Sequence, residues 1–158
     1  MRRGSPMPAF FRKDMPGYWD RYPDHLRDMA QIMAGSRLTP ATMHVMGEPT
    51  DESAPTALIF TMEPHAVIGR HAHDCERFEI ILEGSLLVDD MVLGPGDVMI
   101  ARPGEAYGPH TAGPEGCRTL EIFSTLAGAH HLMYETPDGP LSVDFGSLEA
   151  LAASQRAG

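Results

Sequence analysis

The chain has 158 residues, a length that fits one domain with a single hydrophobic core. Its 22 acidic and 12 basic residues give a formal net charge of -10, which disfavours nucleic acid and anionic membrane surfaces as partners. The sequence shows no apolar run of about 18 residues, no secretion signal, and only two cysteines, Cys75 and Cys117, too few for a disulfide framework. We therefore expect a cytoplasmic protein with reduced thiols.

The first third of the chain predicts an arm, a helix and a leading strand. Several prolines within residues 1–17 favour an irregular arm. Between residues 18 and 34, apolar residues recur at steps of three and four, which indicates an amphipathic helix ending near Gly35. The members of this apolar face are Trp19, Tyr22, Leu26, Met29, Ile32 and Met33. A short strand is expected at residues 42–46.

From residue 56 to 125, short apolar runs alternate with Gly and Pro, without helical periods between them. These runs are Ala57–Met62, Phe78–Leu82, Leu86–Val88, Val98–Ala101 and Thr119–Phe123. Such spacing predicts an all-β antiparallel sandwich or barrel, with a hairpin turn at Asp89-Asp90 and a second turn at residues 94–97. We expect residues 1–55 to pack on the barrel, residues 56–126 to form its core, and residues 127–158 to add a strand and a short helix at residues 147–153.

Two segments carry motifs of a known family. Residues 69–84 contain His71-Ala72-His73 followed by a strand ending in Leu82-Glu83-Gly84, and residues 94–107 contain a Pro-Gly-Asp strand and a Pro-Gly turn. Together they resemble the paired motifs of the cupin superfamily over about residues 64–123. The resemblance implies a single RmlC-like cupin barrel, also called a double-stranded β-helix or jelly roll, and a homodimer.

The resemblance also implies a metal site, from which this chain departs at two positions. Cupins usually hold a metal with the two histidines of the first motif, a carboxylate or amide about four residues later, and a histidine of the second motif. His71 and His73 match the pair. Arg77 fills the carboxylate position, and Tyr107 fills the second histidine position, three residues before His110.

The carboxylate ligand depends on the turn after His73. A three-residue turn at residues 74–76 places Arg77 and Glu79 on the inner face and favours Glu79 as a ligand. A two-residue turn instead turns Glu76 inward. The sequence leaves both registers open. Elsewhere we expect Glu121 to point into solvent and the pair at residues 130–131 to lie on the surface or face a partner subunit.

The site hypothesis combines the residues with the resemblance. His71 and His73 are two apart, so on a strand both imidazoles point to one face with Cα atoms roughly 7 Å apart. We expect His71, His73, Glu79 and His110 to hold a divalent transition metal (Fe, Mn, Ni or Zn). Tyr107 is then a proton donor, acceptor or ligand. Arg77 suits an anionic group, because its planar fork binds carboxylates in a bidentate manner.

Two functions follow from this site. The leading hypothesis is a metal-dependent enzyme, a dioxygenase, lyase or isomerase, that acts on a small organic substrate, anionic if Arg77 binds it. The alternative is a metal-free cupin that binds a small metabolite as a sensor or accessory protein, which the replaced ligand positions favour. The fold does not choose between them, because function resides in the site.

Overall fold

The computed structural model of the protein describes residues 38–144 together with residues 12, 16, 20, 22–24, 26 and 27, and side chains in the first strand are described from Met43 on. The expected arm, most of the helix at residues 18–34 and the helix at residues 147–153 lie outside the described residues. Two members of the expected apolar helix face, Tyr22 and Leu26, are described, and both are buried in the core.

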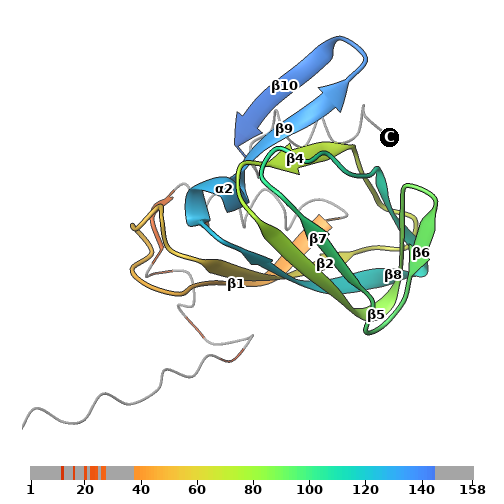
Figure 1. The fold of residues 1–158 in the computed structure, drawn as a ribbon. Coiled ribbons are helices and arrows are strands. Elements are labelled where there is room, and N and C mark those ends of the chain that lie inside the picture. Colours follow the sequence, from red (N-terminus) through yellow and green to blue (C-terminus); the bar gives the residue numbers. More distant parts are fainter. Residues whose placement is uncertain are drawn as a thin grey trace, which may run out of the picture.

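Antiparallel strands are the main secondary structure of the described residues (Figure 1). Their bounds are β1 Leu38–Val45, β2 Thr56–Met62, β3 Val67–Ile68, β4 His71–His73, β5 Arg77–Val88, β6 Met91–Leu93, β7 Val98–Ala101, β8 His110–Phe123, β9 His131–Thr136 and β10 Gly139–Asp144, with helix α2 at Leu126–His130. The larger sheet has the order β1-β2-β8-β5-β6, with β3 paired to β8 and β7 to β5. The smaller sheet has the order β10-β9-β4. This confirms the predicted antiparallel β-barrel.

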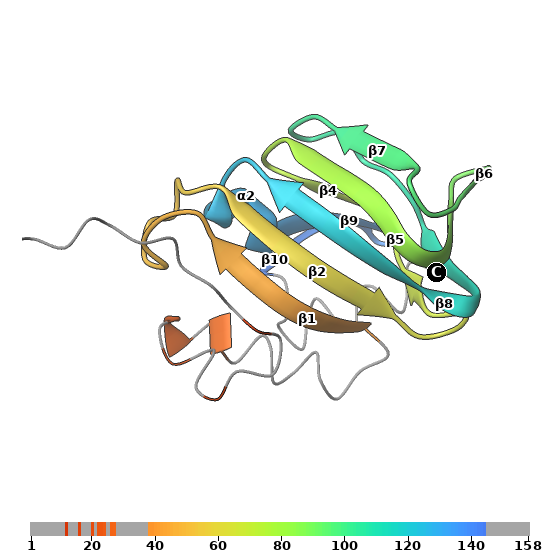
Figure 2. The ribbon, with the colours of Figure 1, turned by 90° about the horizontal axis from the view of Figure 1, so that it is seen from below.

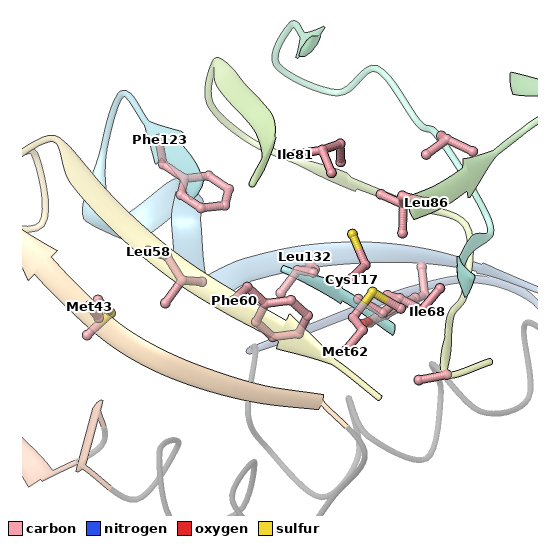
Figure 3. Packing of buried hydrophobic residues seen from close by; sticks show 14 of the residues in the cluster. Met43, Leu58, Phe60, Met62, Ile68, Ile81, Leu86, Cys117, Phe123 and Leu132 are labelled. Carbon is pink, nitrogen blue, oxygen red and sulfur yellow. The ribbon is translucent and has the colours of Figure 1, made fainter. Parts of the chain in front are cut away.

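The core lies between the two sheets. Strand β2 alternates buried and half-buried residues, which places Leu58, Phe60 and Met62 on the inner face. Figure 2 shows β8 running between β2 and β5 in the larger sheet, with β4, β9 and β10 behind it. Figure 3 shows Phe60 of β2 and Leu132 of β9 within one apolar cluster, which also includes Phe123. Burial of these side chains stabilises the barrel by roughly 2 kcal/mol each.

The strands differ from the prediction where glycine permits a close approach. The runs at residues 78–82 and 86–88 belong to one strand, β5, and the polar segment between them contains Gly84. Gly84 has a φ of +73°, and a Cβ there would lie 2.0 Å from the carbonyl oxygen of Gly116 on β8. The strand therefore continues through an irregular step in its pairing with β8. The Asp89-Asp90 turn is confirmed, since Val88 pairs with Met91.

The connection from β4 to β5 places the first motif inside the barrel. Arg77 and Glu79 are buried while Glu76 is exposed, so the three-residue turn is the observed one and the two-residue turn is wrong. The strands are not paired with each other, because β4 pairs with β9 whereas β5 pairs with β7 and β8. The turn thus crosses from one sheet to the other.

Among the described residues, the structure contains no helix with the length and apolar character of a membrane span.

Candidate metal and ligand site

His71 and His73 lie on β4 with their rings turned into the barrel, 4% and 6% exposed, and their ring centroids are 5.3 Å apart. The Nδ1 atom of His71 lies 2.7 Å from the Gly69 carbonyl oxygen, and that of His73 lies 2.8 Å from the Gly128 carbonyl oxygen. A carbonyl oxygen can only accept, so each Nδ1 carries the proton and donates it. Each Nε2 keeps its lone pair for another partner.

The second motif brings Tyr107 and His110 to the same place. Tyr107 exchanges two backbone hydrogen bonds with His71, at 3.1 and 3.0 Å, and its ring stacks on that of His110 with centroids 5.2 Å apart. His110 opens β8, is buried, and its ring centroid lies 5.8 Å from that of His71. Its Nε2 is buried without a hydrogen-bond partner. The His71 ring therefore lies near both other imidazoles, and all three line one cavity.

Burial keeps these imidazoles neutral. Loss of solvent, with a smaller contribution from the Arg77 cation, lowers the pKa of His71 to about 4. The same cause holds the pKa of His73 and of His110 well below the usual 6.5. A neutral imidazole can bind a metal or accept a proton, and a protonated one can do neither. At pH 7 all three are in the form that the site hypothesis requires.

Arg77 is neutralised by two carboxylates within the barrel. Its Nη2 lies 3.1 Å from Oε2 of Glu79 and 3.1 Å from Oε2 of Glu121, and Thr119 donates a hydrogen bond to the other oxygen of Glu121. Burial opposes the charge of Arg77, but the coulombic effect of Glu121 and Glu79 raises its pKa overall. Burial raises the pKa of Glu79 to about 7, although Arg77 opposes this. Arg77 thus has internal counter-charges without any ligand.

The prediction that Glu121 points into solvent is wrong, because its carboxylate is buried against Arg77. Strand β8 pairs with β5 so that Glu121 lies directly opposite Glu79. The available sequence signal was the alternation of Thr119, Glu121 and Phe123, which share one strand face. A buried Arg77 also demands a counter-charge, and Glu121 supplies it.

Four buried side-chain atoms among the described residues have no hydrogen-bond partner: Nη1 of Arg77, the Tyr107 hydroxyl, Nε2 of His110, and Oε2 of Glu79, which is held only by its ion pair with Arg77. The guanidinium of Arg77 also stacks over the Tyr107 ring at 4.8 Å. The histidines, Arg77 and Glu121 line a cavity of about 30 Å³ together with apolar side chains. This volume holds about one or two water molecules. Buried polar atoms without a partner are costly, so these groups gain stability from any polar group that enters the cavity.

The donor atoms of the predicted ligands suit a metal ion, but the placement of these ligands fits one only in part. Neutral imidazoles with free Nε2 atoms suit divalent first-row metals. Within the described residues, no group of three or more His, Cys, Asp or Glu side chains stands ready to coordinate an ion. Glu79, the expected carboxylate ligand, instead faces Arg77. Of the predicted ligands, His71, His73 and His110 have no ion pair with another described residue, but they do not stand in coordinating positions.

The family follows from the comparison with known proteins. Residues 58–123, which contain both motifs and the whole site, match the family model of the cupin domain. This segment therefore matches a cupin domain, which bears out the predicted resemblance to the cupin superfamily. No curated protein matches its sequence.

Several solved structures resemble the barrel at low sequence identity. The Rhodobacter sphaeroides complex of SigE with the anti-sigma ChrR gives 16% identity over 51% of this chain and 43% of that chain, with a TM-score of 0.42. Bacillus subtilis oxalate decarboxylase at pH 4.6 gives 18% identity over 63% and 26%, with a TM-score of 0.46. An RmlC-like cupin protein from Ralstonia eutropha gives 16% identity over 59% and 60%, with a TM-score of 0.45. The matched region spans less than half of the first two of these chains.

Proposed function

We propose that the protein binds a divalent transition metal through the Nε2 atoms of His71, His73 and His110, and acts as a metal-dependent enzyme on a small organic molecule. The observation that carries this proposal is the set of three buried, neutral imidazoles, of which His110 has an Nε2 without a partner. A bound Fe, Mn, Ni or Zn ion would supply Lewis-acid or, for the redox-active metals, electron-transfer chemistry. Dioxygenase, lyase and isomerase remain the candidate reaction classes.

The charges around the histidines tolerate a cation despite Arg77. When Glu79 and Glu121 are both ionised, the cluster they form with Arg77 has a net charge of −1. An arriving cation also favours the ionised form of Glu79, whose pKa of about 7 leaves it poised near neutral pH. In this proposal Glu79 stays with Arg77 and offsets its charge, whereas coordination rests on the histidines.

Tyr107 and Arg77 would act on the substrate. Burial raises the pKa of Tyr107 above its usual value of 10, so the phenol stays protonated and can donate to a substrate oxygen. Nη1 of Arg77 is a buried donor without a partner, suited to an oxygen of an anionic substrate. Both groups border the histidine cluster, since Tyr107 contacts His71 and His110, and Arg77 lines the same cavity as the histidines.

The test of metal binding is elemental analysis of protein purified without a chelating tag. We expect stoichiometric transition metal in the wild type and background levels in the double variant His71→Ala/His73→Ala, with the β-rich circular dichroism retained. His65→Ala, which removes an exposed histidine outside the site, is the control and should keep the metal. Near-equal occupancy in the double variant would refute the ligand assignment.

A second candidate is a metal-free cupin that binds a small anionic metabolite, favoured by Arg77 and Tyr107 at ligand positions. A thermal-shift screen would identify a carboxylate, which is then titrated by calorimetry beside its amide. Arg77→Ala should weaken carboxylate binding about tenfold to a few hundredfold, and Arg77→Lys should not restore it. A metal-free wild type with this behaviour would establish the second candidate. Equal losses for carboxylate and amide would mean that Arg77 is structural.

A further inference from the structure

Outside the barrel interior, three side chains of the β9–β10 hairpin form a continuous chain of hydrogen bonds. Ser142 Oγ lies 3.0 Å from Nε2 of His131, and Nδ1 of His131 lies 3.1 Å from Oδ1 of Asp144. The strand register explains the meeting, because His131 on β9 pairs directly with Asp144 on β10, and Ser142 follows on the same face two residues away. All three residues are exposed, while Leu132 and Val143 between them are buried.

When the His131 ring is neutral, the contacts select one of its two tautomers. The Asp144 carboxylate can only accept, so Nδ1 of a neutral His131 carries the ring proton and donates it. Nε2 is then an acceptor, and the Ser142 hydroxyl must donate to it. A serine hydroxyl that donates to an imidazole held by a carboxylate is the arrangement that activates a serine as a nucleophile.

A pocket opens beside this chain of hydrogen bonds. It has a volume of about 200 Å³ and is lined by His131, Ser142, Met133 and Asp74, and also by His73 of the histidine cluster. Met133 and Ala72 supply an apolar wall, and Asp74 supplies a negative charge at the surface. The net charge of −10 adds to this field. A short, neutral acyl group suits the pocket, and an anionic one is disfavoured.

We infer that Ser142, His131 and Asp144 form a second, metal-independent site that reacts with small neutral esters. Ser142 Oγ attacks the carbonyl carbon while its proton passes to Nε2 of His131. The bond to the leaving alcohol then breaks, and His131 returns the proton to that alcohol. Water, deprotonated by His131, then attacks the acyl carbon, the bond from that carbon to Ser142 Oγ breaks, and His131 returns the proton to Oγ, so that ester and water give acid and alcohol. Asp144 is a positioning residue that holds the His131 tautomer.

The exposure of the site favours a covalent readout over turnover. The side chain of His131 is 50% exposed, and electrostatic stabilisation of an oxyanion is weaker in contact with water. We therefore choose a fluorophosphonate probe, with EDTA present to exclude metal chemistry. The Oγ–P bond forms, the P–F bond breaks, and fluoride leaves with the hydroxyl proton. Peptide mass mapping should place the adduct on Ser142, with p-nitrophenyl acetate hydrolysis as the second assay.

The variants separate chemistry from structure. His131→Gln should slow labelling of Ser142 at least about 100-fold, the lower range for a lost general base. Asp144→Asn should slow it at least about tenfold, because an amide can donate to Nδ1 and favour the wrong tautomer, whereas Asp144→Glu should recover part of the rate. His65→Gln is the control and should label like the wild type, since His65 is exposed and lies outside the hairpin, whereas Nδ1 of His130 lies 4.0 Å from Oδ1 of Asp144.

Three results would overturn the inference. The first is no adduct on Ser142 in the wild type. The second is labelling of Ser142 at the wild-type rate in His131→Gln with an unchanged thermal midpoint. If His131→Gln does not fold, Asp144→Asn and Asp144→Glu are compared instead. Equal rates of Ser142 labelling in these two variants would be the third result that overturns the inference. Because His73 also lines this pocket, the wild type with and without EDTA separates the two proposals: labelling of Ser142 that persists in EDTA is independent of the proposed metal function.

Discussion

Arg77 and Glu121 meet inside the barrel through two contacts to one oxygen, with Nε of the guanidinium 3.2 Å and Nη2 3.1 Å from Oε2 of the carboxylate. The residues come from the adjacent strands β5 and β8, and Glu79 joins them from β5. A guanidinium with two carboxylates thus lies where a purely apolar barrel would place hydrophobic side chains. This cluster links the stability of the barrel to its site.

Removal of the guanidinium alone should destabilise the protein severely. Arg77→Met leaves Glu79 and Glu121 buried without a counter-charge, and we expect a loss of about 3 to 5 kcal/mol in the free energy of unfolding. The triple variant Arg77→Met/Glu79→Leu/Glu121→Leu removes the whole cluster and should be more stable than the single variant. Urea denaturation checks both. A loss below about 1 kcal/mol in Arg77→Met would contradict the argument.

We expect the Tyr107 hydroxyl to lower the free energy of unfolding of the ligand-free protein. It is buried without a partner, so Tyr107→Phe should leave the free energy of unfolding unchanged or raise it by up to about 1 kcal/mol. Tyr22→Phe is the matched control, because the Tyr22 hydroxyl donates to the Met43 carbonyl oxygen and its loss should cost about 1 kcal/mol. Thermal and urea unfolding of both variants give the comparison. A clear destabilisation by Tyr107→Phe would show that the hydroxyl has a structural partner.

Gly84 and Gly104 offer a matched pair of glycines. Their φ angles are +73° and +75°, so alanine is strained to a similar extent at both, by roughly 1 to 2 kcal/mol. A Cβ at residue 84 would also lie 2.0 Å from the Gly116 carbonyl oxygen, whereas a Cβ at residue 104 meets nothing within 4 Å. We expect Gly84→Ala to be less stable than Gly104→Ala by at least about 2 kcal/mol. Equal losses would mean that the two strands separate at little cost.

The metal-free protein should lose stability on acidification. Burial lowers the pKa of His71 from 6.5 to about 4, so the unfolded chain binds more protons between these values and stability rises with pH there. At about 1.4 kcal/mol per pH unit, this single site contributes on the order of 3 kcal/mol. His73 and His110 act in the same direction. Urea unfolding between pH 4 and 7, with a chelator present, measures the slope.

Glu79 opposes this trend and provides a control. Its pKa is raised from 4.5 to about 7, so the folded protein binds more protons in that range and stability falls as pH rises. Glu79→Gln should therefore make the gain in stability between pH 4.5 and 6.5 steeper than in the wild type. A shallower slope in Glu79→Gln would mean that Glu79 is ionised throughout the range.

Local sequence patterns were enough to predict strands and tight turns, because these depend on residues close together in the chain. The alternation of apolar residues and the Gly and Pro turns predicted β7 at its observed bounds and the Asp89-Asp90 hairpin. The sequence allowed two lengths for the turn after His73. The three-residue turn placed Arg77 and Glu79 on the inner face, where both are buried. Side-chain direction along a strand has a period of two, so such inferences need no distant contact.

Pairing between distant strands decided the rest. Glu121 turns inward because β8 pairs with β5 in a register that places it opposite Glu79, a contact between residues more than 40 positions apart. Likewise, His131 meets Asp144 and Ser142 only because β9 pairs with β10. Residue order does not state which strands pair or in which register, and a shift by one residue would turn each of these side chains to the opposite face. The residue types therefore set the chemistry that each site can perform, whereas the pairing of distant strands brings those residues together.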